Sequence, residues 1–200
     1  VWSSGDETVA KVSEDGTVTA VAEGTATITA GTPDGAQTAT CTVTVIAATA
    51  ATEYYEKVTS APEDWSGEYL IVYEDGSVAF DGSLSTLDAA GNTIEVETED
   101  NKIEATDDVN DAAFTIAKME GGYSVKAASG KFIGATSYAN SLASSDSEIA
   151  NSLSLDASGN AVIKVTTSGG DVTLRYNYGS NQLRFRYYKS GQQAIQLYKK

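Results

Sequence analysis

The side chains best suited to ligand recognition gather toward the C-terminus. Sugar rings stack their C–H faces on aromatic rings, and arginine or asparagine side chains donate hydrogen bonds to hydroxyl groups. All three arginines of the chain lie between positions 171 and 200, where Asp171 is the only acidic residue. The candidate ligand-binding residues are Arg184, Arg186, Tyr188, Tyr176, Tyr178 and Asn181, together with Trp65 earlier in the chain.

Strand alternation gives the same stretch a structural interpretation. Successive side chains of a strand point to opposite faces, so the odd-numbered positions from 183 to 187 would face the core. Arg184, Arg186 and Tyr188 would then face outward, where the arginines can form ion pairs with the abundant carboxylates. Trp65 has two interpretations as well: an exposed platform in a loop, or a plug at the base of a barrel. A binding role and a structural role both stay open.

Catalysis is not expected. The chain has no histidine, which removes the commonest general base near neutral pH and the commonest metal ligand. Catalytic triads with histidine and histidine-ligated zinc are therefore excluded. A glycosidase needs only two carboxylates, but no pair among the 28 acidic residues is distinguished by its setting. The sequence predicts a non-enzymatic protein without a cofactor or metal.

One acidic segment, 107–111, contains Asp107, Asp108, Asn110 and Asp111 and concentrates oxygen ligands of the kind that calcium prefers. The segment lacks the glycine and the closing glutamate of the helix-loop-helix calcium motif. We expect a solvated loop there, with calcium binding as the lesser alternative.

The charge balance excludes several classes of partner. A formal charge of −15, from 28 acidic and 13 basic residues, repels nucleic acid and anionic membranes. No apolar run approaches the roughly 20 residues that span a bilayer, so membrane insertion is not expected. With Cys41 alone, the chain forms no internal disulfide. Cys41 alternates with Ala39, Val43 and Val45, which predicts a buried thiol on the inner face of a strand.

The first 46 residues consist of short alternating strands separated by glycine turns at Gly16, Gly24 and Gly35. This segment closely resembles the second half of the group 2 bacterial immunoglobulin-like domain. The matching positions are 1–4, 6, 9–10, 12, 15–21, 23–28, 34–35 and 39–45. The resemblance implies part of an immunoglobulin-like β-sandwich.

The strands that precede Trp2 in that family are missing from this sequence, which therefore indicates a fragment. A partial sandwich exposes an unpaired edge and an open core face. We expect the second domain, another copy of the chain or residues outside the fragment to cover that face. Self-association through the open edge is one such possibility.

Residues 47–53 form a linker of small residues, and residues 54–200 form a second domain. Three segments of that domain, beginning at Gly67, Gly122 and Gly170, each contain an alternating strand, a turn and a second strand with an aromatic residue. Threefold hairpin repetition at a spacing of about 50 residues is typical of a β-trefoil. The stretch 121–137 also resembles the repeat of fascin-type and ricin-type trefoils. A second β-sandwich or a non-trefoil barrel is the alternative.

The expected protein is thus all-β, bacterial, and extracellular or on the cell surface. The segment 183–199 resembles the end of many secreted multidomain proteins of gut bacteria, which implies an appended domain. The leading hypothesis for function is a non-catalytic module that binds carbohydrate and is carried on an immunoglobulin-like spacer. The alternative is an adhesion or structural stalk domain that contacts host or bacterial surface proteins.

Overall fold

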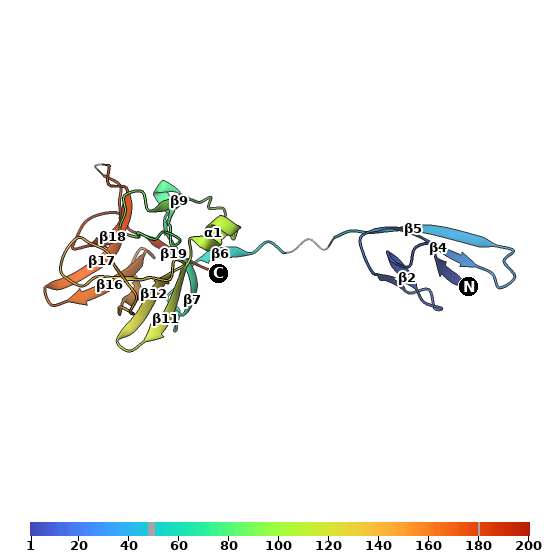
Figure 1. Cartoon of the computed structure of the whole chain (residues 1–200), viewed down its shortest axis with the longest axis horizontal. Coiled ribbons are helices and arrows are strands. Elements are labelled where there is room, and N and C mark those ends of the chain that lie inside the picture. The colour runs from blue at the N-terminus through green and yellow to red at the C-terminus, as the bar shows by residue number, and fades with distance from the viewer. Residues whose placement is uncertain (48–50, 180) are drawn as a thin grey trace. The chain divides into compact units, whose positions relative to one another are not determined.

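The computed structural model describes residues 1–47, 51–179 and 181–200, and its regular secondary structure consists almost entirely of strands (Figure 1). The predicted all-β class is confirmed. The chain divides into two compact units, Val1–Ala51 and Thr52–Lys200, called unit 1 and unit 2 below. Part of the expected linker, residues 48–50, lies outside the described residues. No helix in the described ranges is long and apolar enough to cross a bilayer.

Unit 1 is a three-stranded sheet with a two-stranded ribbon. The sheet has the order β1-β4-β5, and the ribbon pairs β2 with β3. The strands are β1 (Trp2–Ser4), β2 (Ala10–Val12), β3 (Val18–Ala20), β4 (Gly24–Gly31) and β5 (Thr38–Val45). Val9, Ala10 and Ala26 form a small core against which Val45 packs.

The prediction of a buried thiol at Cys41 is wrong. Cys41 lies opposite Ile28 in the β4–β5 register, so the two side chains share a face of the sheet. Ile28 is buried, but Cys41 is exposed. The ribbon strand β2 contacts β1 and β4, and β5 pairs with β4 alone among the described strands. Alternation therefore placed Cys41 correctly on the same face as buried Ile28. The β2–β3 ribbon that packs on this face covers β4 but does not extend over Cys41 in β5.

Unit 2 contains a larger and a smaller sheet. The larger has the order β10-β6-β19-β7-β11-β12-β13-β14, with β8 joining β7 to β9, and the smaller has the order β15-β16-β17-β18. Its elements are β6 (Tyr54–Lys57), β7 (Gly67–Tyr73), the 3-10 turn η1 (Glu74–Gly76), β8 (Val78–Phe80), β9 (Thr93–Glu95), β10 (Lys102–Glu104), α1 (Asp107–Asp111), β11 (Phe114–Met119), β12 (Gly122–Ala127), β13 (Phe132–Gly134), β14 (Ala143–Ser145), β15 (Ser152–Leu155), β16 (Ala161–Thr167), β17 (Gly170–Asn177), β18 (Arg184–Tyr188) and β19 (Gln196–Lys199).

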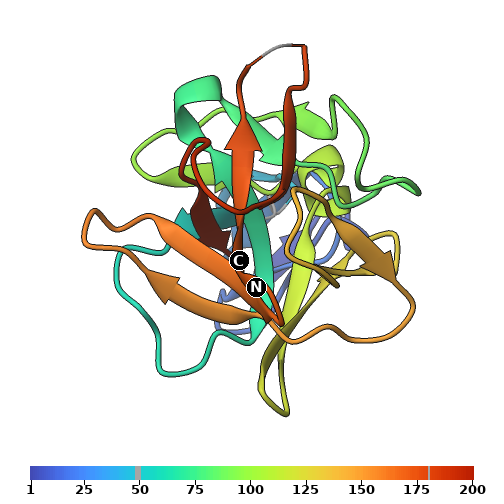
Figure 2. The same ribbon diagram turned by 90° about the vertical axis from the view of Figure 1, so that its left-hand side faces the viewer.

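The three predicted repeat segments each form an antiparallel strand pair: β7–β8, β12–β13 and β17–β18. The first strand of each begins at a glycine with positive φ, namely Gly67 at 144°, Gly122 at 147° and Gly170 at 135°. Side chains rarely adopt this backbone conformation, which explains the glycine at each start. Figure 2 shows the strand pairs around the interior of unit 2. The threefold closure of a trefoil stays a prediction.

The core of unit 2 is aromatic at its centre. The ring of Phe80 lies 5.3 Å from that of Phe185 in a stacked arrangement and 4.9 Å from that of Phe114. Trp65 is buried in the same cluster. Tyr187 is also fully buried, and its hydroxyl donates a 2.6 Å hydrogen bond to Asn151 Oδ1. Buried polar atoms such as these need partners, and this pair supplies them.

The buried tyrosines predict a loss of stability at alkaline pH. Burial raises the pKa of Tyr69 from its ordinary value of 10.0 to about 12, and burial also raises the pKa values of Tyr55, Tyr187 and Tyr198. The folded state thus favours the neutral phenol. Its stabilising contribution is complete below pH 10.0 and is lost as the pH rises toward 12. Urea unfolding at about pH 9 and about pH 11, with tyrosinate absorbance, measures the effect. Equal stability at both pH values would contradict it.

Candidate functional site

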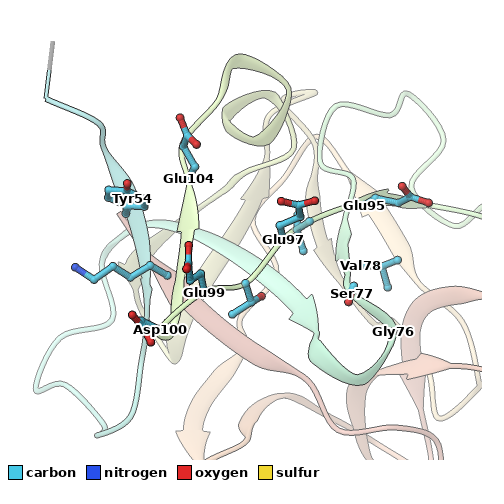
Figure 3. Close-up of a pocket in the computed structure, with 12 residues that line it drawn as sticks. Tyr54, Gly76, Ser77, Val78, Glu95, Glu97, Glu99, Asp100 and Glu104 are labelled. Atoms are coloured by element: carbon cyan, nitrogen blue, oxygen red, sulfur yellow. The ribbon is translucent and has the colours of Figure 1, made fainter. Parts of the chain in front are cut away.

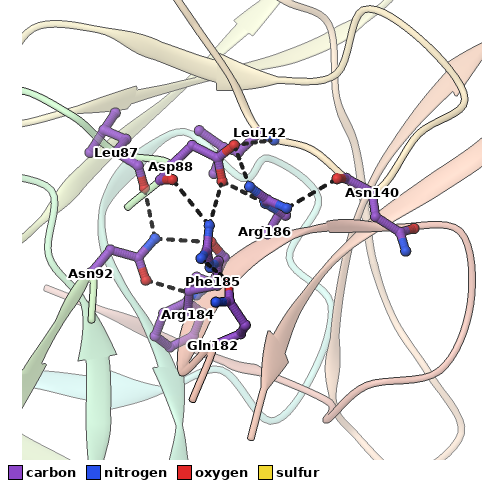
Figure 4. Close-up of polar contacts among 9 residues, drawn as sticks. All are labelled: Leu87, Asp88, Asn92, Asn140, Leu142, Gln182, Arg184, Phe185 and Arg186. Carbon is purple, nitrogen blue, oxygen red and sulfur yellow. Dashed lines mark hydrogen bonds and ion pairs between the residues drawn. The ribbon is translucent and has the colours of Figure 1, made fainter. Parts of the chain in front are cut away.

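The predicted C-terminal arginines lie in an ion-pair network around Asp88 (Figure 4). Arg186 donates two hydrogen bonds to the Asp88 carboxylate, from Nε to Oδ1 at 2.6 Å and from Nη2 to Oδ2 at 2.8 Å. Arg184 donates to the Asp88 carbonyl at 3.3 Å, and its guanidinium lies 3.8 Å from Oδ1. The hydrogen bond to Asp88 raises the pKa of Arg186. Both arginines therefore bind a carboxylate of their own chain.

The network also fixes two loops to β18. Asn92 donates to the carbonyls of Leu87 and Phe185, at 2.7 and 2.9 Å, and accepts from the Phe185 N–H at 2.8 Å. Arg186 donates to the Asn140 carbonyl at 3.2 Å, and the Leu142 N–H donates to Asp88 Oδ2 at 3.4 Å. The segments 87–92 and 140–142 are thereby held on one strand. This is a structural role.

Three other predicted ligand-binding residues are buried, which corrects their assignment. Trp65 belongs to the core, as the plug interpretation expected. Tyr176 is also in the core and stacks on Tyr73 at a ring distance of 4.6 Å. Tyr188 is only 6% exposed, so its expected outward orientation does not make it accessible. A ligand at the surface cannot stack on a ring that neighbouring side chains cover.

The expected inward face of the last repeat is confirmed at Phe185 and Tyr187, both of which are fully buried. The expectation for Leu183 is wrong, since its side chain is exposed. Leu183 precedes the first residue of β18, so strand alternation does not apply to it. Of the predicted binding residues, Tyr178 and Asn181 are the two that lie exposed at the surface.

An open hollow on unit 2, with a volume of about 1230 Å³, is a candidate site (Figure 3). It is lined by residues of β6, the η1–β8 turn, the segment 95–100 and β10. Five lining side chains carry carboxylates: Glu95, Glu97, Glu99, Asp100 and Glu104. A smaller hollow of about 520 Å³ shares Glu95.

Local sequence explains how the carboxylates reach the surface. In the segment 95–99 acidic and non-acidic residues alternate, and Val96 is buried while its N–H donates to the Ser77 carbonyl at 3.0 Å. Glu95 and Glu97 then point away from the core. Asp100 and Asn101 adopt positive φ values of 49° and 61°, a conformation that these residue types tolerate in tight turns. The turn brings the chain back into β10.

Tyr54 supplies an aromatic ring at the hollow, with 42% of the residue exposed. Lys102 Nζ lies 5.7 Å from the ring centroid and 2.7 Å from a carboxylate oxygen of Glu56. The hydrogen bond with Glu56 raises the pKa of Lys102. The one basic residue of this lining is thus already paired, and the hollow presents net negative charge.

The sequence interpretation missed this hollow. The feature of the sequence that could have indicated the hollow is the alternation of glutamates from Glu95 to Glu99. The same pattern is also typical of an ordinary solvated turn. The segment 107–111, expected as a loop, forms α1, with Thr106 accepting the Val109 N–H through its side chain at 3.3 Å. Among the described residues, no group of three or more acidic or cysteine side chains is arranged to hold a metal ion.

The comparisons with known proteins match part of the chain. Residues 1–43 match the family model of the group 2 bacterial Ig-like domain. The predicted resemblance of this segment is confirmed at that level. A stretch of 44 residues is also 64% identical to a protein named alpha-L-arabinofuranosidase from Bifidobacterium longum subsp. longum. That match covers 22% of this chain and 4% of the relative. No solved structure matches the chain significantly.

Proposed function

We propose that unit 2 is a non-catalytic module that binds neutral carbohydrate in the Tyr54 hollow, and that the bacterial Ig-like domain serves as its spacer. The observation that carries the proposal is the exposed ring of Tyr54 beside five carboxylates in one open hollow. We further propose a trefoil-like closure for unit 2 and an extracellular or cell-surface location.

The chemistry of the lining suits a sugar. Sugar hydroxyls donate hydrogen bonds, and carboxylate oxygens accept them strongly. The Tyr54 ring offers an apolar surface for sugar C–H groups, and Lys102 Nζ lies 5.7 Å from the ring centroid. A volume of about 1230 Å³ accommodates more than one sugar ring.

Charge narrows the ligand class. The hollow has five carboxylates, and Lys102 is engaged with Glu56. A uronic acid or a sulfated sugar would bring a like charge into this field, whereas a neutral sugar would not. The net charge of −15 of the whole chain also disfavours an anionic sugar.

The name of the relative that matches 44 residues of this chain supports a carbohydrate ligand. The named relative of the 44-residue stretch is an alpha-L-arabinofuranosidase, a name that denotes action on a sugar. We infer that this chain is part of a multidomain protein in which unit 2 brings a neighbouring activity to a glycan. The parent activity and its substrate are part of the proposal.

Binding is expected to depend on the ring and the carboxylates of the hollow. Tyr54→Ala and Glu97→Gln should each weaken binding of a neutral glycan about tenfold or more, because one removes the stacking face and the other a strong acceptor. Calorimetry on the full chain, with neutral ligands chosen by glycan-array screening, measures this. Tyr138→Ala is the matched control, since Tyr138 is 46% exposed but does not line the hollow. No binding at millimolar sugar, or unchanged binding in both variants, would overturn the proposal.

An adhesion or stalk domain is the second candidate function. The observation that favours it is the engagement of Arg184 and Arg186 with Asp88 of the same chain. Unit 2 would then contact a protein partner or act as a spacer. Glycan binding that is lost with Tyr54→Ala would decide against it.

A further inference from the structure

A second exposed aromatic ring lies close to η1. Tyr178 is 63% exposed, more than either Tyr54 or Tyr138. Its ring centroid lies 6.2 Å from that of Tyr73, and Tyr73 stacks on buried Tyr176 at 4.6 Å with an interplanar angle of 21°. Two rings packed into the core thus support an exposed third ring. Such support restricts the ring before a ligand arrives, which lowers the entropy cost of binding.

Tyr73 connects this ring to the hollow. A Cβ atom added at Gly76 would lie 2.7 Å from the Tyr73 ring, so the ring packs directly on the Gly76 backbone. Gly76, Ser77 and Val78 in turn line the hollow. Figure 2 shows η1 beside the end of β17, the strand that leads to Tyr178, and Figure 3 shows the same turn at the edge of the hollow.

The η1 turn therefore lies between two exposed aromatic rings. On one side are Tyr54 and the carboxylates of the hollow, and on the other is Tyr178, with exposed Asn181 three residues further along the chain. Ser77 has a φ of 51°, and its N–H donates to the Glu74 carbonyl at 2.9 Å, which closes the turn tightly.

We propose that Tyr178 is a second sugar subsite, and that unit 2 recognises an extended neutral oligosaccharide chain rather than a single terminal sugar. This inference rests on the proposed function, because the hollow supplies the first subsite. One part of the chain occupies the hollow beside Tyr54, and a later sugar stacks on Tyr178 after crossing η1. The ligand class is a linear neutral polysaccharide or its oligosaccharide fragments.

Tyr178 also packs beside Tyr73, so it could have a purely structural role. The effect of Tyr178→Ala on sugar binding distinguishes that role from a subsite. If shielding were its only role, Tyr178→Ala would affect ligands of every length equally, through a change in the fold. A subsite affects long ligands and spares short ones. The length dependence of binding therefore separates the two roles.

The test is calorimetry on the full chain with xylo-, arabino- and cello-oligosaccharide series from disaccharide to hexasaccharide. We expect affinity to rise with length in a series that binds. Tyr178→Ala should weaken hexasaccharide binding about tenfold and leave disaccharide binding unchanged, while Tyr178→Phe should retain both. Tyr54→Ala should weaken every length, and Tyr138→Ala none.

The outcomes distinguish the two proposals. Binding that depends on Tyr54 but not on ligand length, or an equal loss at all lengths in Tyr178→Ala, would overturn the second subsite alone. A protein partner that requires Tyr178 while sugar binding does not would overturn it too. Absence of binding in all three series would overturn the extended-chain inference, and the glycan-array result would then decide the proposed function separately.

Discussion

Replacing Asp88 by alanine is expected to lower the free energy of unfolding of unit 2 by about 3 kcal/mol. The substitution leaves two guanidinium groups without their shared carboxylate, and their side chains are only 11% and 25% exposed at Arg184 and Arg186. Removing one partner of such a pair costs more than the pair itself contributes, because the remaining charges stay partly desolvated. In the same step, segment 87–92 loses its ion pairs to β18, and the Leu142 N–H loses its acceptor. Urea unfolding monitored by tryptophan fluorescence measures the change.

The matched control is Asp146→Ala. Asp146 also forms an ion pair, with Lys131, but its side chain is 88% exposed. Exposed pairs contribute about 0–1 kcal/mol, since water and salt already screen them. A loss of similar size in both variants would show that the Asp88 network behaves as an ordinary surface ion pair.

Phe80→Ala is expected to have the largest effect on stability, a loss of about 3 to 5 kcal/mol. The Phe80 ring is fully buried and lies between those of Phe114 and Phe185, at 4.9 and 5.3 Å. Its removal leaves a cavity where strands of both sheets of unit 2 meet, and aromatic side chains around it cannot collapse without leaving their rotamers. Thermal and urea unfolding both report the loss.

Leu183→Ala provides the comparison for Phe80, because Leu183 is 43% exposed. Its substitution should change stability by less than about 0.5 kcal/mol. If Phe80→Ala cost no more than Leu183→Ala, the central position of Phe80 in the core would be disproved. Phe80→Leu, which keeps much of the volume, should recover part of the loss.

Features that depend on residues close in sequence were predicted correctly, whereas features that depend on residues distant in sequence were not. Local alternation identified the inward side chains of Phe185 and Tyr187. It also placed Cys41 on the face of β5 that lies opposite Ile28. It did not predict burial at Cys41, because burial depends on what packs over a face. Glycines at Gly67, Gly122 and Gly170 marked the repeat starts because the backbone there excludes a side chain.

The candidate site was less predictable. The partner of Arg186 lies 98 residues away at Asp88, and no local pattern identifies which carboxylate a distant arginine meets. Tyr176 and Tyr178 are close in sequence and of one type, yet Tyr73 covers the first and leaves the second exposed. The hollow requires β6, η1 and the segment 95–104 to lie together, which is a property of the tertiary fold.

The position of β19 has a consequence for protein synthesis. This strand pairs with β6 along one edge and with β7 along the other, so residues 196–199 separate the first two strands of unit 2. The ribosome releases the N-terminal part of the chain first. Strand β6 therefore cannot join the sheet beside β7 until β19 has been synthesised, because β19 lies between them. Unit 2 therefore completes its larger sheet only after its entire sequence has left the ribosome. Until then β6 and β7 each carry an unpaired edge, and a nascent chain stalled before residue 196 would be prone to strand-mediated aggregation.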